Sequence, residues 1–284
     1  MRGQKWIRII CSRGTTLDVI LVKLGGSLIT DKGQPETARP QAIERLAAEI
    51  ARGAELVAPA RLIVGHGSGS FGHVAAARYE IAGGLSSRSQ LPGISLTQER
   101  AAALHWQVVA ALAAAGALPF SLAPSSALVT AGRSPVAFAD EPLLLALERG
   151  LLPVIYGDVV LDRERGVAIC STESLFALLA QRLPERGVSV RRTIWLGETA
   201  GVYGRDGGLL PLLTRSDLDA AGTAIGGSAG TDVTGGMRHR VETALALADL
   251  GVPSLIADGQ VPGLLESALA GEEVPGTIVV TRAA

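Results

Sequence analysis

The run Val19-Ile20-Leu21-Val22-Lys23-Leu24-Gly25-Gly26-Ser27 joins a short apolar stretch to a pair of adjacent glycines. The apolar part is typical of a strand that is buried on both faces, as in parallel sheets covered by helices. Adjacent glycines let backbone N–H groups approach a polyanion without obstruction by Cβ atoms, and Lys23 adds a positive charge at the same place. A plain tight turn would give the same letters, so the meaning of this run depends on the rest of the chain.

Similar apolar runs alternate with helical patterns along the sequence. The further candidate strands are Arg61–Val64, Leu152–Tyr156, Thr193–Leu196, Ser254–Ala257 and Thr277–Thr281. The helical patterns are Pro40–Val57, Gln98–Ala115, Glu173–Leu183 and Met237–Leu250. This alternation predicts an α/β fold, a three-layer αβα sandwich around a mostly parallel open sheet. The glycine-rich segment Gly204–Gly230 interrupts the alternation and is predicted to be a mobile loop region.

Composition excludes several classes of protein. The 284 residues carry 26 Lys and Arg against 27 Asp and Glu, and no long basic run favours nucleic-acid binding. Cys11 and Cys170 match no metal-ligand spacing and indicate no disulfide framework, so a cytoplasmic location is the simplest interpretation. The apolar piece Trp6–Cys11 is too short for a signal peptide or a membrane span. Residues 1–18 are expected to be a disordered extension or an artefact of the assigned start codon.

A second glycine cluster, Gly65-His66-Gly67-Ser68-Gly69-Ser70-Phe71-Gly72-His73, follows a predicted strand and precedes a helical pattern. A loop that enters a helix presents unpaired N–H groups and the positive end of the helix dipole, which suits a phosphate. Gly67, Gly69 and Gly72 also fit the dinucleotide spacing, but no suitable acidic residue ends a following strand. The Walker A ending and the protein-kinase signature set are absent from the sequence.

A third turn, Tyr156-Gly157-Asp158, ends another predicted strand. An Asp at the carboxyl end of a parallel strand lies on the edge where such sheets bind ligands, although an Asp that merely caps a turn explains it equally well. Three such turns on one edge of one sheet favour a site that handles phosphate.

Together these motifs resemble the amino-acid kinase superfamily and, more narrowly, its isopentenyl phosphate kinases. The matching pieces span most of the chain in family order: Val22–Lys32, Thr37-Ala38-Arg39, Gly65–His73, Tyr156-Gly157-Asp158-Val159, Gly201-Val202-Tyr203 and Asp232-Val233-Thr234-Gly235-Gly236-Met237. The Lys-Gly-Gly-Ser piece is shared across the superfamily. The Thr-Asp-Lys that ends at Lys32 and the Gly-Ser-Phe-Gly-His that ends at His73 point to the isopentenyl phosphate branch and its fosfomycin kinase relatives.

The resemblance implies a role for each matching residue. The ATP phosphates would be held by Lys23, Gly25, Gly26 and Ser27, with Ser68 nearby. The phosphate of the acceptor would be held by Gly67, Gly72, His73 and Thr172. Lys32 would neutralise charge on the transferred phosphoryl group, and Asp158 would orient the basic side chains. The nucleotide lobe would include Glu198, Tyr203, Gly236 and Arg240.

The same resemblance implies the larger organisation and the reaction. A kinase domain over residues 19–284 would have an acceptor-binding lobe to about residue 190 and a nucleotide-binding lobe beyond it. It would phosphorylate isopentenyl phosphate in isoprenoid precursor synthesis, use ATP with Mg²⁺ carried by the nucleotide, and form a homodimer. No protein residue is assigned as a metal ligand.

Elementary chemistry agrees with a phosphate acceptor. Phosphoryl transfer depends on positioning and charge stabilisation, so Lys and N–H groups should outnumber acid–base residues. A phosphomonoester has a second pKa of about 6, so its oxygen is already an anionic nucleophile and needs no general base. A carboxylate acceptor is also anionic and stays open. His73 suits a donor to the incoming phosphate, whereas His66 is interpreted as structural, His105 as a helix residue, and His239 is left undecided.

The sequence departs from the family pattern at three places. Arg240 stands where these kinases usually carry a lysine, and its guanidinium is bulkier although it keeps the charge. Glu198 alone replaces two acids of the usual run, and Ser171-Thr172-Glu173 replaces Ser-Gly-Asp. Two alternatives therefore remain: a kinase with another phosphate, phosphonate or carboxylate acceptor, and a non-catalytic protein that stores or senses anions or nucleotides.

Overall fold

The structure is a computed structural model that describes residues 16–204, 206–217 and 235–281. Several predicted features lie wholly or partly outside the described residues. They are the extension up to residue 15, residues 218–230 of the predicted mobile loop, and the motif residues Asp232, Val233 and Thr234.

The main sheet of the described chain has eight strands in the order β10-β12-β11-β9-β1-β2-β6-β3. Its strands are β1 (Leu17–Leu24), β2 (Arg61–His66), β3 (Pro119–Ser121), β6 (Leu152–Tyr156), β9 (Val188–Gly197), β10 (Leu212–Leu213), β11 (Ser254–Asp258) and β12 (Thr277–Val279). Only the β11–β12 pair among these is antiparallel. The predicted mostly parallel sheet is confirmed, and its first strand begins at Leu17, before the predicted Val19.

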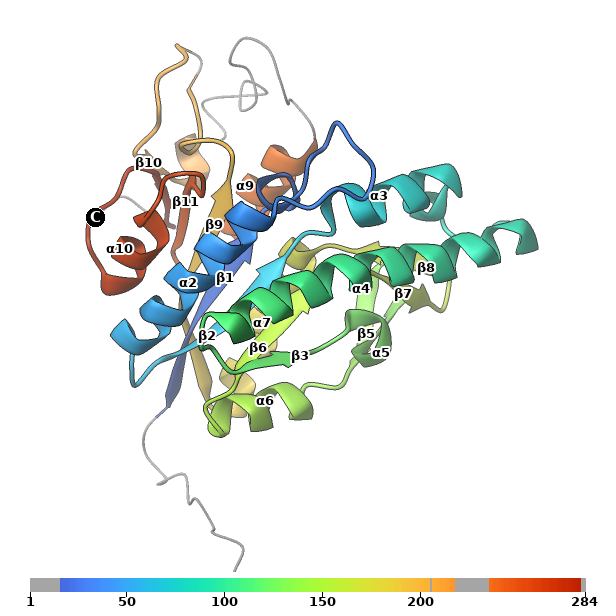
Figure 1. Cartoon of the computed structure of the whole chain (residues 1–284), viewed down its shortest axis with the longest axis horizontal. Coiled ribbons are helices and arrows are strands. Elements are labelled where there is room, and N and C mark those ends of the chain that lie inside the picture. Colours follow the sequence, from blue (N-terminus) through green and yellow to red (C-terminus); the bar gives the residue numbers. More distant parts are fainter. Residues whose placement is uncertain (1–15, 205, 218–234, 282–284) are drawn as a thin grey trace, which may run out of the picture.

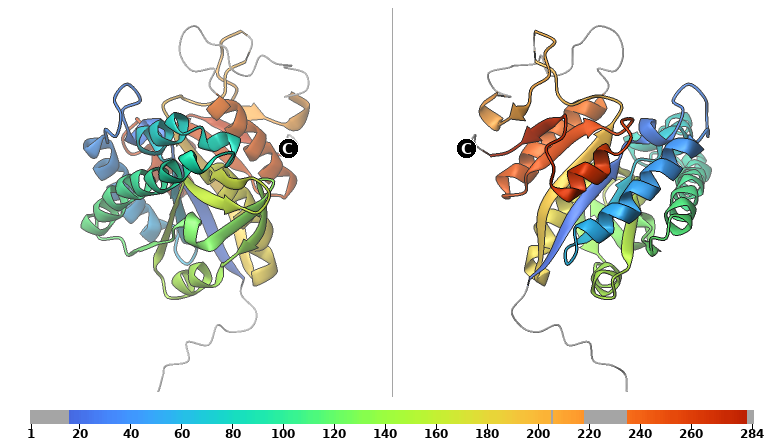
Figure 2. Two further views of the ribbon diagram at one scale, coloured as in Figure 1. Left: turned by 90° about the vertical axis from the view of Figure 1, so that its right-hand side faces the viewer. Right: turned by 60° about the vertical axis from the view of Figure 1, so that its left-hand side comes forward.

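Helices cover both faces of this sheet, so the predicted three layers are confirmed (Figures 1 and 2). One face carries α2 (Pro40–Leu56), α4 (Leu91–Ala114) and α10 (Leu264–Ala270), and the other carries α6 (Glu141–Glu148), α7 (Thr172–Arg182) and α9 (Gly235–Asp249). α2 begins with Pro40 at its first turn and buries Ile43, Leu46 and Ile50 at helical spacing. α4 begins at Leu91, well before the predicted Gln98, and α6 and α10 were not predicted.

A second, four-stranded sheet was not predicted. Its strands are β4 (Leu128–Ala131), β5 (Ser134–Phe138), β7 (Asp158–Asp162) and β8 (Gly166–Cys170), in the order β5-β4-β7-β8. The remaining short elements are α1 (Gly26–Ile29), α3 (Gly69–Arg78), α5 (Pro124–Ala127), η1 (Ile81–Gly83), η2 (Arg88–Gln90) and η3 (Pro184–Arg186). β7 follows β6 directly, so Gly157 joins the two sheets.

The strand register brings the predicted turns to one edge of the main sheet. Leu24 pairs with His66 on one side and with Leu196 on the other, and His66 pairs with Tyr156. Because these strands are parallel, their carboxyl ends all lie at that edge, toward the top of Figure 1. No helix within the described ranges combines the length and the apolar character that crossing a bilayer requires.

Candidate active site

The glycine turns after β1 and β2 are in backbone contact. A Cβ built on Gly26 would lie 2.8 Å from both Cα and N of Gly69, and one built on Gly67 would lie 3.0 Å from the N of Gly26. A Cβ on Gly25 would lie 2.8 Å from the carbonyl oxygen of Leu196, at the end of β9. Gly69 also has a φ of +51°, which favours glycine. The sequence predicted two separate turns, and the structure joins them into one cradle of backbone atoms.

α3 begins inside this cradle and carries His73. Ser68 precedes the helix, and its carbonyl accepts hydrogen bonds from the N–H groups of Phe71 and Gly72. The exposed imidazole of His73 has Nδ1 2.7 Å from the carbonyl oxygen of Gly69. Because a carbonyl only accepts, Nδ1 carries the proton, and Nε2 donates only when the ring is an imidazolium. His73 can therefore bind a phosphate oxygen through Nε2 as a cation.

Lys32 lies on a loop that is fastened to the start of α3. The loop is closed by a bridge between Thr30 and Ala38, and Lys32 is exposed two residues after Thr30. The N–H of Ser70 donates to Oγ1 of Thr30 over 3.1 Å, and the N–H of Thr37 donates to Oγ of Ser70 over 3.3 Å. These bonds hold the Lys32 loop and the His73 helix together as one unit.

Lys23 forms a buried ion pair with Glu173, which lies in the first turn of α7. Nζ of Lys23 is 2.5 Å from Oε1 of Glu173. Burial lowers the pKa of Lys23 and the charge of Arg240 lowers it further, while Glu173 opposes both effects. Burial would raise the pKa of Glu173, but the neighbouring Lys23 and Arg240 charges hold it below its usual value. Glu173 is therefore ionised at neutral pH and fixes the position of Lys23.

Arg240 on α9 completes this cluster of charges. Its guanidinium lies against the Gly25 turn and the end of β9, since a Cβ on Gly25 or Gly197 would lie 3.7 Å or 2.7 Å from its terminal nitrogens. The arginine thus lies directly beside the predicted ATP-phosphate turn. Gly197 leaves room for the bulkier guanidinium.

The carboxylate of Asp158 has backbone partners. Its carboxylate accepts hydrogen bonds from the N–H groups of Val159 at 2.8 Å and Ser125 at 3.3 Å. Burial raises the pKa of Asp158 while these hydrogen bonds lower it in part. The side chain that pairs with Lys23 is that of Glu173, and the orienting role of Asp158 stays a prediction. Asp158 fixes the start of β7 and the short helix α5.

Thr172 lies in the site, but its hydroxyl is already used. Oγ1 of Thr172 donates to the carbonyl oxygen of His66 over 2.7 Å, and the N–H of Gly157 donates to the same oxygen over 2.9 Å. Any contact between Thr172 and the acceptor phosphate would therefore use its backbone N–H at the start of α7. The ends of β2 and β6 and the start of α7 meet at this point.

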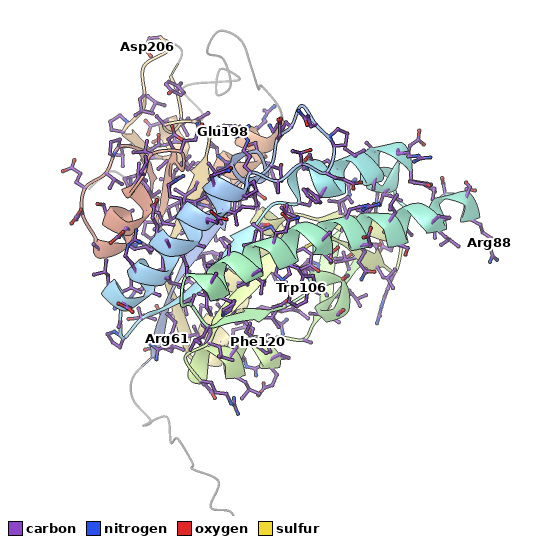
Figure 3. All side chains as sticks on the ribbon, in the orientation of Figure 1. Arg61, Arg88, Trp106, Phe120, Glu198 and Asp206 are labelled. Atoms are coloured by element: carbon purple, nitrogen blue, oxygen red, sulfur yellow. The ribbon has the colours of Figure 1, made fainter. Side chains whose placement is uncertain are left out.

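The residues predicted for the nucleotide side lie around the ends of β9 and α9. Glu198 pairs with Arg39 at 2.6 Å, and Figure 3 shows it near the same upper edge of the sheet. Tyr203 forms an isolated bridge with Leu209, and Gly236 lies in the first turn of α9. Ser27 is half-buried in α1. The nucleotide roles of these four residues stay predictions.

The sequence prediction missed two contacts. The Lys23–Glu173 pair joins residues 150 positions apart, and the only sequence signal was that Glu173 departs from the family pattern. The second is a hydrogen bond between His66 and His105, for which the sequence carried no signal. His239, undecided from sequence, has Nε2 3.2 Å from Oγ of Ser171 at the start of α7.

The site suits the phosphates of a nucleotide more than a bound metal. Replacement of its glycines by any other residue would put Cβ atoms into the cradle. Lys23 and Arg240 supply positive charge beside it. Within the described part of the chain, no group of three or more His, Cys, Asp or Glu residues could hold a metal ion. Backbone donors and cations of this kind bind phosphate oxygens.

Comparison with known proteins identifies the family. Residues 18–258 match the amino acid kinase family. The chain belongs to this family. It is 38% identical to the isopentenyl phosphate kinase of Methanothermobacter thermautotrophicus, over 93% of this chain and 100% of that enzyme.

Further kinases extend this similarity. A solved structure described as an isopentenyl phosphate kinase superposes with a TM-score of 0.78 at 32% identity, covering 92% of this chain and 100% of that one. The glutamate 5-kinase of Geobacter sulfurreducens is 31% identical over 91% of this chain and 66% of that enzyme. The predicted resemblance to isopentenyl phosphate kinases is therefore confirmed.

Proposed function

We propose that the protein transfers the γ-phosphoryl group of ATP to the phosphate of isopentenyl phosphate, giving isopentenyl diphosphate and ADP. The observation that carries this proposal is the backbone contact between the Gly25-Gly26 turn and the Gly67–Gly69 loop. This contact places the backbone N–H groups expected to bind the ATP phosphates next to those expected to bind the acceptor phosphate. The acceptor is supported by the full-length similarity to an isopentenyl phosphate kinase.

The transfer requires little acid–base chemistry. An oxygen of the acceptor phosphate attacks the γ-phosphorus, and the bond to the β–γ bridging oxygen breaks, so that ADP leaves with the electron pair. Lys23 and Arg240 would stabilise charge on the ATP side, and Lys32 and the His73 imidazolium on the acceptor side. Mg²⁺ carried by ATP would neutralise the β- and γ-phosphate oxygens.

An apolar cluster next to α3 supports a hydrocarbon acceptor. Ala76, Ile81, Val159 and Val167 are buried together, with Tyr79 and Ile94 packed against them. Ala76 lies one turn beyond His73 on the same helix. A phosphate held at His73 would thus place its substituent beside aliphatic side chains, which favours a prenyl group over an amino acid.

The test is ADP release from MgATP by the purified protein with a panel of acceptors: isopentenyl phosphate, dimethylallyl phosphate, fosfomycin, a small sugar phosphate and glutamate. We expect release with isopentenyl phosphate. Release only with another acceptor would overturn the substrate and keep the kinase. The match to a glutamate 5-kinase makes glutamate the sharpest competitor. Calorimetric ATP binding without turnover on any acceptor would indicate a binding or storage protein instead.

We also propose that the protein forms a homodimer through the side formed by α4 and β3. β3 is an edge strand of the main sheet, and α4 packs against it. Trp106 on α4 and Phe120 on β3 are exposed on this side (Figure 3), and Leu118, two residues before Phe120, is 62% exposed. Aromatic residues make up only 4% of the chain, so their exposure here favours an interface.

The cytoplasmic location, the division into two lobes near residue 190, and Mg²⁺ as the metal carried by ATP stay predictions. β9 (Val188–Gly197) contains the predicted lobe boundary and pairs with β1, so the main sheet is continuous across it.

A further inference from the structure

His66 at the end of β2 and His105 on α4 form a buried pair that the proposed chemistry does not use. Nε2 of His66 lies 3.0 Å from Nδ1 of His105. Nδ1 of His66 lies 3.1 Å from the carbonyl oxygen of Gly67, and Nε2 of His105 lies 2.7 Å from Oγ of Ser121. The ring of Tyr156 stacks on both imidazoles. Ser121, His105, His66 and the Gly67 carbonyl thus form a series of hydrogen bonds that runs from β3, through α4, to the glycine loop.

The protons in this series can be assigned from its two ends. Burial lowers the pKa of His66 to about 4 and that of His105 to about 3, so each ring is neutral and carries one N–H. The Gly67 carbonyl only accepts, which places the His66 proton on Nδ1. Nε2 of His66 then accepts from Nδ1–H of His105, and Nε2 of His105 accepts from the Ser121 hydroxyl. The hydrogen bonds therefore all run in one direction and end at Gly67.

The hydrogen bonds of the two peptide groups that flank Gly67 show which part of the loop the histidine pair holds in place. The carbonyl of His66 accepts from Thr172 and Gly157, and the N–H of Gly67 donates to the carbonyl of Leu24 over 3.1 Å. The carbonyl of Gly67 accepts from the His66 ring. The fourth group, the N–H of Ser68, has no partner among the described residues.

The geometry of the Gly67–Ser68 peptide sets the direction of that N–H. In a trans peptide the N–H and C=O point in opposite directions, so the Ser68 N–H points away from the His66 ring. The nitrogen of Ser68 lies beside the end of β6, since a Cβ on Gly157 would be 3.6 Å from it. Rotation of this peptide would turn the Ser68 N–H away from its present direction.

We propose that His66 is a positioning residue, which holds the Gly67–Ser68 peptide so that the Ser68 N–H can donate to a substrate phosphate bound at this glycine loop. His105 and Ser121 act through His66, because they fix the tautomer that donates to Gly67. The inference rests on the proposed phosphoryl transfer only for the identity of the phosphate.

Two variants of His66 separate positioning from packing. His66→Asn places an amide N–H close to the position of Nδ1 and keeps the donor to Gly67, whereas His66→Leu keeps a similar volume without a donor. Both lose the bond to His105. We expect His66→Leu to raise KM for isopentenyl phosphate or ATP by roughly 10-fold, the scale of one hydrogen bond, and His66→Asn to stay within about threefold of the parent.

The order of these two variants is diagnostic. If His66 had a purely structural role, His66→Leu would be the less damaging variant. Burial of an apolar side chain costs less free energy than burial of an amide that has lost a hydrogen-bond partner. Equal KM values, or a lower KM in His66→Leu than in His66→Asn, with both variants folded by thermal unfolding, would overturn the proposal.

A second readout does not depend on turnover. Long-range ¹H–¹⁵N spectra of the parent should show Nδ1–H tautomers for both His66 and His105, and an Nε2–H tautomer at His66 would overturn the proposal. If the parent turns over no acceptor, the proposed function fails while the tautomers and the calorimetric Kd for ATP in the two variants still test this inference.

Discussion

At the scale of single residues, the ion pair between Lys23 and Glu173 determines how the site holds its charge. Both side chains are buried, and removal of one partner leaves an uncompensated charge. We expect Glu173→Gln to lower the free energy of unfolding by about 3–5 kcal/mol and to raise KM for ATP, because Lys23 loses its fixed position. Urea unfolding at pH 7 and initial rates against ATP concentration measure the two effects.

A second glutamate provides the matched control for this variant. Glu242 pairs with Arg238 one turn away on α9, and both side chains are more than half exposed. Glu242→Gln should change the free energy of unfolding by less than about 0.5 kcal/mol. Equal losses in Glu173→Gln and Glu242→Gln would contradict the role given to the buried pair.

Residues that sit in glycine clusters could be predicted from the sequence, whereas their distant partners could not. Gly26, Gly67 and His73 lie in short local patterns, and the structure brings them to one edge of the sheet. Glu173 lies 150 positions from Lys23, so no local pattern connects them. The family resemblance implied that Asp158 orients the basic side chains, and this stays a prediction; in the structure its carboxylate accepts hydrogen bonds from the N–H groups of Ser125 and Val159.

At the scale of elements, the contact between α1 and the start of α3 sets the width of the site. Gly26 and Gly69 meet so closely that a Cβ on Gly26 would lie 2.8 Å from the backbone of Gly69. We expect Gly26→Ala to separate the two turns and to lower kcat/KM by about 100-fold or more, the scale of one lost charge-stabilising donor. ADP release and thermal unfolding measure the outcome.

Gly83 in η1 is the control for Gly26→Ala. A Cβ on Gly83 would meet nothing within 4 Å. Gly83→Ala should leave activity unchanged and shift stability by less than about 0.5 kcal/mol. Full activity in Gly26→Ala would show that the turns need not touch.

The strands of the main sheet that are buried on both faces could be predicted, whereas the short helices α6 and α10 and the strands of the second sheet could not. The six predicted strands all lie in the main sheet, because apolar runs covered on both faces are visible in sequence. β5 has four exposed residues in a row, so it shows no buried alternation. β7 follows β6 without a loop, and the sequence therefore showed one strand and a turn where the structure has two strands.

At the scale of the whole molecule, the buried histidine pair makes stability depend on pH. The pKa values of His66 and His105, about 4 and about 3, lie below that of an unfolded histidine. Below pH 6.5 the unfolded chain therefore binds protons that the folded chain does not, so stability falls as pH falls from about 6.5 toward 4. We expect a loss of about 2 kcal/mol for each histidine between pH 7 and pH 5.

Urea unfolding of the parent and of His105→Gln at both pH values tests this dependence. The variant should lose roughly half of the pH effect. Glu173 does not contribute in this window, because a carboxylate with a lowered pKa loses its stabilising effect only below the unfolded value of 4.5. An unchanged pH effect in His105→Gln would contradict the assignment to the histidine pair.

The proposed dimer also belongs to the whole molecule, since it would cover the edge of the main sheet. Trp106 is 59% exposed and Phe120 is 37% exposed on the side formed by α4 and β3. We expect light scattering to give twice the chain mass of 29.2 kDa for the parent, and one chain mass for the double variant Trp106→Glu with Phe120→Glu. Leu250→Glu, at a residue that is 50% exposed after α9, should stay dimeric. A monomeric parent would remove the dimer, and a dimeric double variant would move the interface to another face.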